Sequence, residues 1–265
     1  MDGQSTTKDN SEAWRKDFLF VSSMILTCCV FGFGLIAIPF WFSNESQRII
    51  SANATSTANA VATQQTQYEI VDRFDASAWY WSENSTNDEY SVHQKKIAGG
   101  IYTWNVDKVK KPFVVWENFY LDDPSSNYFV EPPSNYDVYV DTRIVKGTPG
   151  TVCSGLVFRE SPDGWDQGAF IFVVCNDSTY ALSYYDQKDD WQNIVPRFYS
   201  SSIRKSDWNR LGISSRGAQS VMFINGEMIY VMVDERQIQG DLALIINVNE
   251  APAKVQFDNF GYQSR

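Results

Sequence analysis

Few residues of this chain have the type and spacing of catalytic groups. The only histidine, His93, lies in a polar, strand-like stretch, and we expect it to be a surface residue. With a single histidine, neither a Ser/His/Asp arrangement nor a Cys/His nucleophile finds support. Among the adjacent carboxylates, the pairs Asp122-Asp123, Asp189-Asp190 and Asp234-Glu235 have the composition of loops or strand ends.

The chain is acidic, with a formal net charge of −10 at pH 7. Nucleic-acid binding needs a basic face that neutralises phosphates, so we expect no nucleic-acid partner. The same charge argues against clamping onto anionic lipid headgroups.

The first element that must position any site is a long apolar run, residues 18–42, which contains no charged residue. At about 1.5 Å per residue, a helix of this length exceeds the ~30 Å hydrocarbon core of a bilayer, which predicts a transmembrane helix in contact with lipid. The alternative is a cleaved secretory signal, whose apolar region is usually shorter. Arg15 and Lys16 directly precede the run, and the positive-inside rule then predicts a cytoplasmic N-terminus.

The expected organisation is that of a single-pass protein of the cell membrane. Residues 1–17 are polar and are expected to form a short cytoplasmic tail. Residues 43–67 are rich in Ser, Thr, Asn, Ala and Gln, a composition typical of a flexible stalk. Residues 68–265 are long enough for one sizeable extracytoplasmic domain.

The domain has the pattern of an all-β protein. Short runs rich in Val, Ile, Phe, Tyr and Trp alternate with turn residues, which predicts a sandwich or a barrel. Asn225-Gly226, between two apolar runs, predicts a two-residue hairpin. The predicted strands are 68–73, 90–95, 100–106, 112–119, 135–145, 152–160, 168–175, 179–186, 207–214, 219–224, 227–234, 242–249 and 254–262.

The cysteines fall into two pairs. Cys28 and Cys29 lie within the apolar run, where we expect them to fill space. Cys153 and Cys175 flank a turn predicted at Asp163-Gly164, and a hairpin centred there sets these two cysteines directly opposite each other. Outside the cell such a pair is expected to form a disulfide, with two reduced, packed thiols as the alternative.

The same region resembles the concanavalin A-like lectin/glucanase domains, a jelly-roll group that includes laminin-G-like and keto-disaccharide hydrolase-type domains. The resemblance covers about residues 68–265 and rests on SGLVFRE at 154–160, the Asn225-Gly226 turn and VQFDNF at 255–260. It is closest to bacterial extracytoplasmic modules. It implies a jelly-roll sandwich of two antiparallel sheets, and its motifs specify the fold far better than the function.

The resemblance implies a glycan-binding module. Lectin-like jelly rolls stack aromatic side chains on sugar rings, and the candidates here are Tyr184, Tyr185 and Trp191, with Arg159 as a polar partner. Glycosidases of the group carry their catalytic carboxylates in a Glu-x-Asp-x-x-Glu-like pattern on one strand. That pattern is absent from this sequence. We therefore expect a non-catalytic module rather than an enzyme, with glycoside or keto-sugar hydrolysis as a less favoured alternative.

A third function fits the predicted topology equally well. A single span with one external domain is also the organisation of a structural or accessory subunit of a membrane complex, whose partner would be another protein. No cofactor is expected. Domains of this fold often carry a structural calcium ion, but no spacing of ligands in the sequence singles out such a site.

Overall fold

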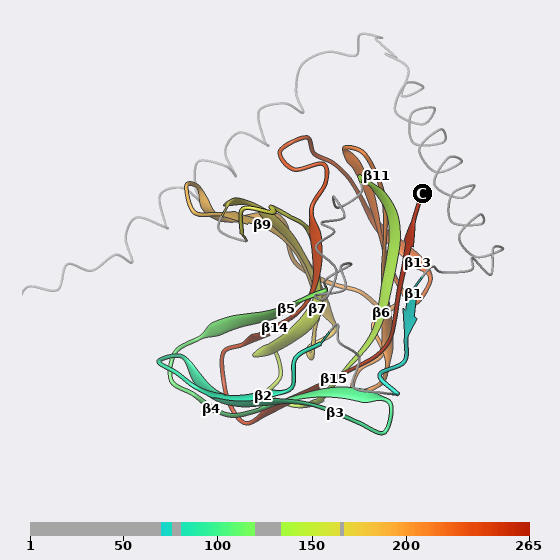
Figure 1. Cartoon of the computed structure of the whole chain (residues 1–265). Coiled ribbons are helices and arrows are strands. Elements are labelled where there is room, and N and C mark those ends of the chain that lie inside the picture. The colour runs from blue at the N-terminus through green and yellow to red at the C-terminus, as the bar shows by residue number, and fades with distance from the viewer. Residues whose placement is uncertain (1–69, 76–80, 120–133, 165–166) are drawn as a thin grey trace, which may run out of the picture. The chain divides into compact units, whose positions relative to one another are not determined.

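A computed structural model describes residues 70–75, 81–119, 134–164 and 167–265 (Figure 1). The regular elements of these residues are all β-strands. The strands are β1 (Ile70–Asp72), β2 (Asn84–Asn87), β3 (Ser91–Ala98), β4 (Ile101–Val109), β5 (Phe113–Phe119), β6 (Asn135–Lys146), β7 (Val152–Glu160), β8 (Ala169–Cys175), β9 (Thr179–Asp186), β10 (Asp190–Tyr199), β11 (Asn209–Arg216), β12 (Gln219–Ile224), β13 (Glu227–Val233), β14 (Asp241–Val248) and β15 (Ala253–Ser264).

The strands form two antiparallel sheets, which confirms the predicted all-β, two-sheet architecture. The nine-stranded sheet has the order β13-β12-β11-β6-β15-β4-β3-β2, and β1 pairs with β15. The six-stranded sheet has the order β10-β9-β8-β7-β14-β5. Strands that are distant in sequence therefore lie side by side, as β7 and β14 do in Figure 1.

Two strands are not predicted from the sequence. β10 is the edge strand of the six-stranded sheet, most of its side chains are exposed, and its register with β9 shifts twice. It also contains Pro196, which an edge strand or a bulge tolerates. β2 is a short, polar edge strand of the other sheet. Neither strand buries one face, so neither shows the alternation that predicts a strand.

The main core lies between the two sheets. Leu156 and Phe172 of the six-stranded sheet belong to the same buried cluster as Trp104 and Phe257 of the nine-stranded sheet. The other face of the six-stranded sheet, here called the outer face, is also apolar. Its buried members are Cys153, Val157, Ala169, Ile171, Val173, Cys175, Ala243 and Ile245. Because β7 and β8 are covered on both faces, they read as nearly continuous apolar runs.

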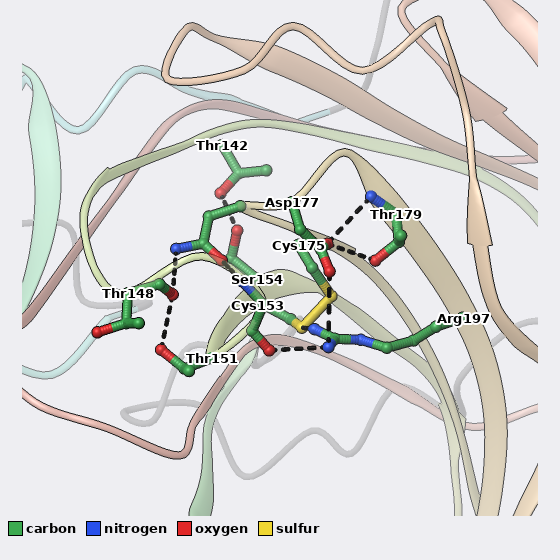
Figure 2. The surroundings of a disulfide bond; sticks show 11 residues. Thr142, Thr148, Thr151, Cys153, Ser154, Cys175, Asp177, Thr179 and Arg197 are labelled. Atoms are coloured by element: carbon green, nitrogen blue, oxygen red, sulfur yellow. Dashed lines mark hydrogen bonds and ion pairs between the residues drawn. A yellow bond between two sulfur atoms is a disulfide. The ribbon is translucent and has the colours of Figure 1, made fainter.

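The predicted disulfide is confirmed. Cys153 and Cys175 are joined, with an S–S distance of 2.06 Å and a Cα–Cα distance of 4.0 Å (Figure 2). They are direct cross-strand partners in the β7–β8 hairpin, the register expected from the turn at Asp163-Gly164. The bridge therefore ties two central strands of the six-stranded sheet at the end remote from the turn.

The predicted hairpin at Asn225-Gly226 is also confirmed. The two residues have φ angles of 52° and 82° and connect β12 to β13. This left-handed pair is the backbone that a two-residue turn between twisted strands requires. The Asn225 side chain adds contacts, because its Nδ2 donates to the Ser202 carbonyl at 2.6 Å and to Asn209 Oδ1 at 2.9 Å.

His93 is buried, so the expectation of a surface residue is wrong. Its Nδ1 lies 2.8 Å from Ser91 Oγ, and its ring stacks on Phe113 with a centroid distance of 6.0 Å. Burial lowers the pKa of the imidazole, and the nearby Lys95 lowers it further. The polar composition of this stretch suggested an exposed side chain. Alternate residues of β3 face the interior, however, and His93 is one of them.

The predicted transmembrane helix, residues 18–42, lies outside the described residues, as do the predicted tail and stalk. Within the described part of the chain, no helix has the length and apolar character needed to cross a bilayer.

Candidate functional site

The outer face of the six-stranded sheet carries the aromatic side chains that are best placed to meet a ligand. Trp191 of β10 is the direct cross-strand partner of Tyr185 of β9. Their ring centroids lie 5.0 Å apart at an interplanar angle of 48°. Trp191 is 45% exposed, so the pair presents an aromatic surface to solvent at the edge of the sheet. Two of the predicted ligand-binding residues are thus brought together.

A shallow apolar hollow adjoins this ring pair. It crosses the sheet from β5 to β10, and its walls carry no charged side chain. The hollow is lined by Val114, Trp116, Val157, Ala169, Ile171, Tyr185, Trp191 and Ile245. Trp116 was not among the predicted site residues. The strand that carries it, β5, was predicted. Which set of alternate side chains on that strand faces outward depends on how the two sheets pack, so the sequence did not place Trp116 on the outer face.

Arg159 does not lie on the outer face. It has a left-handed backbone with φ of 51°, and the register of β7 with β14 shifts between Val157 and Glu160. This bulge turns the Arg159 side chain inward, away from the face on which simple alternation would place it. The residue is fully buried.

The Arg159 guanidinium ties the two sheets together at one end. Its Nε and Nη2 donate to Ser215 Oγ at 3.2 and 3.0 Å. The remaining donors go to backbone carbonyl groups of the β11–β12 turn and of the segment after β13: Gly217, Ala218, Gln219, Asp234 and Gln237. Burial lowers the pKa of the guanidinium, and Tyr136 and Asp234 oppose that shift. With its donors satisfied in this way, Arg159 positions loops rather than a ligand.

Tyr184 also faces the interior and is 4% exposed. Its ring packs at a tilt against Phe170, with a centroid distance of 4.8 Å, and the Arg236 guanidinium lies 4.1 Å from the centroid of the Tyr184 ring. A Cβ at Gly168 would come within 2.6 Å of the Tyr184 hydroxyl, so a glycine is needed there. Adjacent residues of a strand face opposite sides, and only Tyr185 of the pair reaches the outer face.

A charged side chain lies across the disulfide on the same outer face (Figure 2). Arg197 of β10 donates from Nη1 to the Gly150 carbonyl at 2.8 Å and from Nη2 to Cys153 Sγ at 2.8 Å. Its Nη1 also lies 3.8 Å from Asp177 Oδ2. Nearby, Tyr199 pairs with Thr179 and is 65% exposed. Both residues were missed from the sequence because β10, the strand that carries them, was not predicted.

A buried carboxyl group lies at another end of the outer face. Glu160 is 3% exposed and is the cross-strand partner of Asp241. Asn118 Nδ2 donates to Glu160 Oε1 at 3.4 Å, while Oε2 has no hydrogen-bond partner. Burial raises the pKa of Glu160 to about 7. The hydrogen bond from Asn118 opposes the shift, and the charge of Asp241 adds to it.

The acidic pairs occupy loops and strand ends, as predicted, where they are described. Asp189-Asp190 forms part of the β9–β10 turn, and Asp234 pairs with Arg236 at 2.6 Å just after β13. Asp122-Asp123 lies outside the described residues. Among the residues that the structure describes, no group of three or more His, Cys, Asp or Glu side chains is arranged to hold a metal ion.

Comparison with known proteins identifies the fold. No protein-family model matches the sequence, and neither does the sequence of any curated protein. Among solved structures, SCLam, a non-specific endo-β-1,3(4)-glucanase from family GH16, matches with a TM-score of 0.50 and 11% identity over 75% of this chain and 91% of its own. The fold is a concanavalin A-like jelly roll. The resemblance stated from the sequence motifs is thus confirmed for the fold.

Two further solved structures are similar to this chain to different degrees. One comes from work on endo-acting O-glycanases that members of the human gut microbiota express to initiate mucin breakdown. It has a TM-score of 0.51 and 9% identity over 75% of this chain and 100% of its own. The other, carbohydrate-binding module CBM66 from Bacillus subtilis, is a weaker match, with a TM-score of 0.42 and 12% identity over 70% of this chain and 96% of its own.

The expectation that this domain is not an enzyme is overturned. Two solved structures that match with a TM-score of 0.50 or more are named for a GH16 glucanase and for endo-acting O-glycanases, so this fold gives no ground for expecting a domain without catalysis. The expectation rested on the missing Glu-x-Asp-x-x-Glu pattern. That pattern is only one way in which a glycosidase can place its carboxylates, with all of them on one strand. A fold can host the same chemistry with other residues, because function belongs to the site rather than to the scaffold.

Proposed function

We propose that the outer face of the six-stranded sheet binds a glycan. The observation that carries the proposal is the Tyr185–Trp191 ring pair beside an apolar hollow. Sugar rings present C–H surfaces that stack on aromatic faces, and polar groups at the margin then orient the hydroxyls. Of the four ligand-binding residues predicted from the sequence, the proposal retains Tyr185 and Trp191, because Arg159 and Tyr184 face the interior.

The jelly-roll neighbours support the choice of ligand class. SCLam acts on β-1,3(4)-glucan, and the gut O-glycanases act on mucin glycans. Both are polymers of sugars, so glycans of these two kinds are the first probes. Overall acidity of the chain favours a neutral glycan, because an anionic one would be repelled.

The test is a binding measurement with the full-length chain on immobilised β-1,3-glucan, mixed-linkage β-glucan and mucin O-glycans. We expect Trp191→Ala to lower the affinity by roughly tenfold, the loss of about 1.4 kcal/mol of stacking. Trp208→Ala is the matched control. Trp208 is a half-buried tryptophan of the loop directly before β11, away from the outer face, and it packs under Arg143. Its loss should leave affinity unchanged. Equal affinity of the Trp191 variant and the wild type would reject the site.

A second candidate function, glycoside hydrolysis, is favoured by the Glu160–Asp241 pair. Cβ atoms of direct cross-strand partners lie about 5 Å apart, so the two side chains can bring their carboxyl groups within the roughly 5–10 Å over which glycosidases place them. A carboxyl group with a pKa of about 7 can serve as the general acid near neutral pH. Release of reducing ends from β-glucan that disappears in both Glu160→Gln and Asp241→Asn would establish this function, and binding without turnover by the wild type would reject it.

We further propose that residues 18–42 anchor the domain to the cell membrane and hold it outside the cell. The support is the uncharged apolar run with basic residues on its N-terminal side. In that position the outer face would meet extracellular polysaccharide, which fits the ligand class proposed above.

A further inference from the structure

We propose that the ligand is a linear, neutral oligosaccharide that runs along strands β9 and β10, from the Tyr185–Trp191 ring pair to Tyr199. This inference rests on the proposed glycan binding. It adds the direction in which the ligand lies, the length of chain that the protein contacts and the charge class of the sugar.

The direction of the sugar chain follows from which outer-face side chains are exposed. On β7 and β14, the outer-face side chains of Val157, Ala243 and Ile245 are buried. On β10, Trp191 and Tyr199 are exposed. A sugar chain that crossed the sheet would contact exposed aromatic side chains only at β10. Over β7 and β14 it would meet side chains that are buried. A chain laid along β9 and β10 meets accessible side chains over its whole length.

Polar side chains follow the ring pair along this path. The register places Ser183 of β9 opposite Asn193 of β10, on the same face as Tyr185 and Trp191. Ser183 Oγ donates to Asn193 Oδ1 at 3.4 Å, a long hydrogen bond between exposed groups. A sugar hydroxyl can replace so weak a bond at little cost. Ala181, the next outer-face residue of β9, is small enough for a sugar ring to approach the sheet.

At the far end of the path lie a second exposed aromatic side chain, Tyr199, and the Arg197 side chain, which its partners hold against the disulfide. Tyr199 lies opposite Thr179, again on the outer face. Arg197 is held beside it by the Gly150 carbonyl, Cys153 Sγ and Asp177, so its guanidinium covers the disulfide as Figure 2 shows. The path therefore begins and ends on an exposed aromatic ring, with hydroxyl and amide groups between.

The length of the path sets the length of the ligand. Thr179 and Tyr185, the β9 partners of Tyr199 and Trp191, are six residues apart, or about 20 Å along a strand. Several consecutive sugar rings of an extended chain are needed to cover that distance. The site therefore recognises the interior of a linear glycan rather than a single terminal sugar.

The charges along the path favour a neutral sugar. Asp186, Asp189 and Asp190 form the turn beside Trp191. At the other end, the charge of Arg197 is offset by Asp177. The turn beside Trp191 carries one cation, Lys188, against these three carboxylates, so its net charge is negative and a uronic acid or a sialylated chain would be repelled at the ring pair.

The experiment is calorimetric titration of the full-length chain with laminari-oligosaccharides and cello-oligosaccharides, each from disaccharide to hexasaccharide, and with oligogalacturonides as the anionic probe. We expect affinity to rise with chain length in a neutral series and no binding of the oligogalacturonides. Tyr199→Ala should lower hexasaccharide affinity about tenfold and leave the disaccharide nearly unchanged. Phe198→Ala is the matched control, because Phe198 is the neighbouring residue, is 63% exposed and contacts Tyr180 on the other face.

The outcomes separate the inference from the function on which it rests. Hexasaccharide affinity that falls in Trp116→Ala and not in Tyr199→Ala shows a chain lying across the sheet and overturns the inference alone. Affinity that is the same for the disaccharide and the hexasaccharide also overturns it, while glycan binding stands. Failure of the wild type to bind any neutral glycan rejects the proposed function and the inference together. Thermal melting of each variant confirms that the fold is intact.

Discussion

At the scale of single residues, the last two residues of β7 are buried ionisable groups whose charges are treated differently by their surroundings. Arg159 is fully engaged with carbonyl groups of neighbouring loops, so its charge is compensated and its role is structural. Glu160 is buried with one carboxyl oxygen unpartnered, so burial favours its neutral form. Glu160 is therefore one residue through which pH near neutrality acts on this domain.

We predict that Glu160 makes the fold less stable as pH rises from about 4.5 to about 7. In that window the folded protein keeps the proton on Glu160 while the unfolded chain has lost it, so the free energy of unfolding falls with increasing pH. The contribution is on the order of 3 kcal/mol and is complete above pH 7. Glu160→Gln should remove this dependence, as urea denaturation at pH 5 and pH 8 would reveal.

The control for this measurement is Glu83→Gln, which changes an exposed glutamate. Its free energy of unfolding should follow the wild type at both pH values. A Glu160→Gln profile that is parallel to the wild type would show that this carboxyl ionises normally in the folded protein.

At the scale of elements, the β7–β8 hairpin is the centre of the six-stranded sheet. Both strands are buried on both faces, and the disulfide joins them at the end remote from their turn. Gly155 allows the two strands to approach, because a Cβ there would lie 2.0 Å from the Phe172 carbonyl oxygen. Arg197 then crosses the bridge from β10, which links the hairpin to the edge of the proposed glycan path.

We predict that Cys153→Ser lowers the melting temperature and that the Cys153→Ser/Cys175→Ser double variant costs little more. The bridge spans 22 residues of sequence. In the chain-entropy model a loop of that size stabilises the fold by about 3 kcal/mol. Differential scanning calorimetry measures the loss, and mass spectrometry of unreduced peptides identifies the pairing. Wild-type protein treated with reductant should have the same melting temperature as the single variant. Two free thiols in the native chain would contradict the prediction.

At the scale of the whole molecule, we propose different roles for two parts of the chain. The jelly roll would bind the glycan, and the apolar run at 18–42 would anchor the domain to the membrane. The glycan path lies entirely on β9 and β10 of the domain. The sequence pattern of residues 43–67 is that of a stalk, which would give the domain reach from a surface. Under the proposed membrane anchoring, the side of the membrane on which the domain is held would decide which glycans it can meet.

We predict that protease added to intact cells digests the domain and leaves cytoplasmic proteins whole. The physical reason is the positive-inside rule, since Arg15 and Lys16 precede the apolar run. Immunoblotting against the domain before and after treatment provides the measurement, with a cytoplasmic enzyme as the control. A domain that becomes sensitive only after the membrane is breached would reverse the predicted orientation.

The sequence by itself determined the strands that bury one face or both, because their apolar periodicity and their turn residues are local properties. It also determined the Asn225-Gly226 turn and the Cys153–Cys175 register, since a short hairpin sets its pairing from its turn. Only the tertiary structure decided which faces are exposed. The bulge at Arg159 reverses the direction of a side chain, and β10 forms an edge strand without alternation because it pairs with β9 on one side alone. Trp116, Arg197 and Tyr199 join the candidate site through strand order, which brings together residues that no local pattern connects.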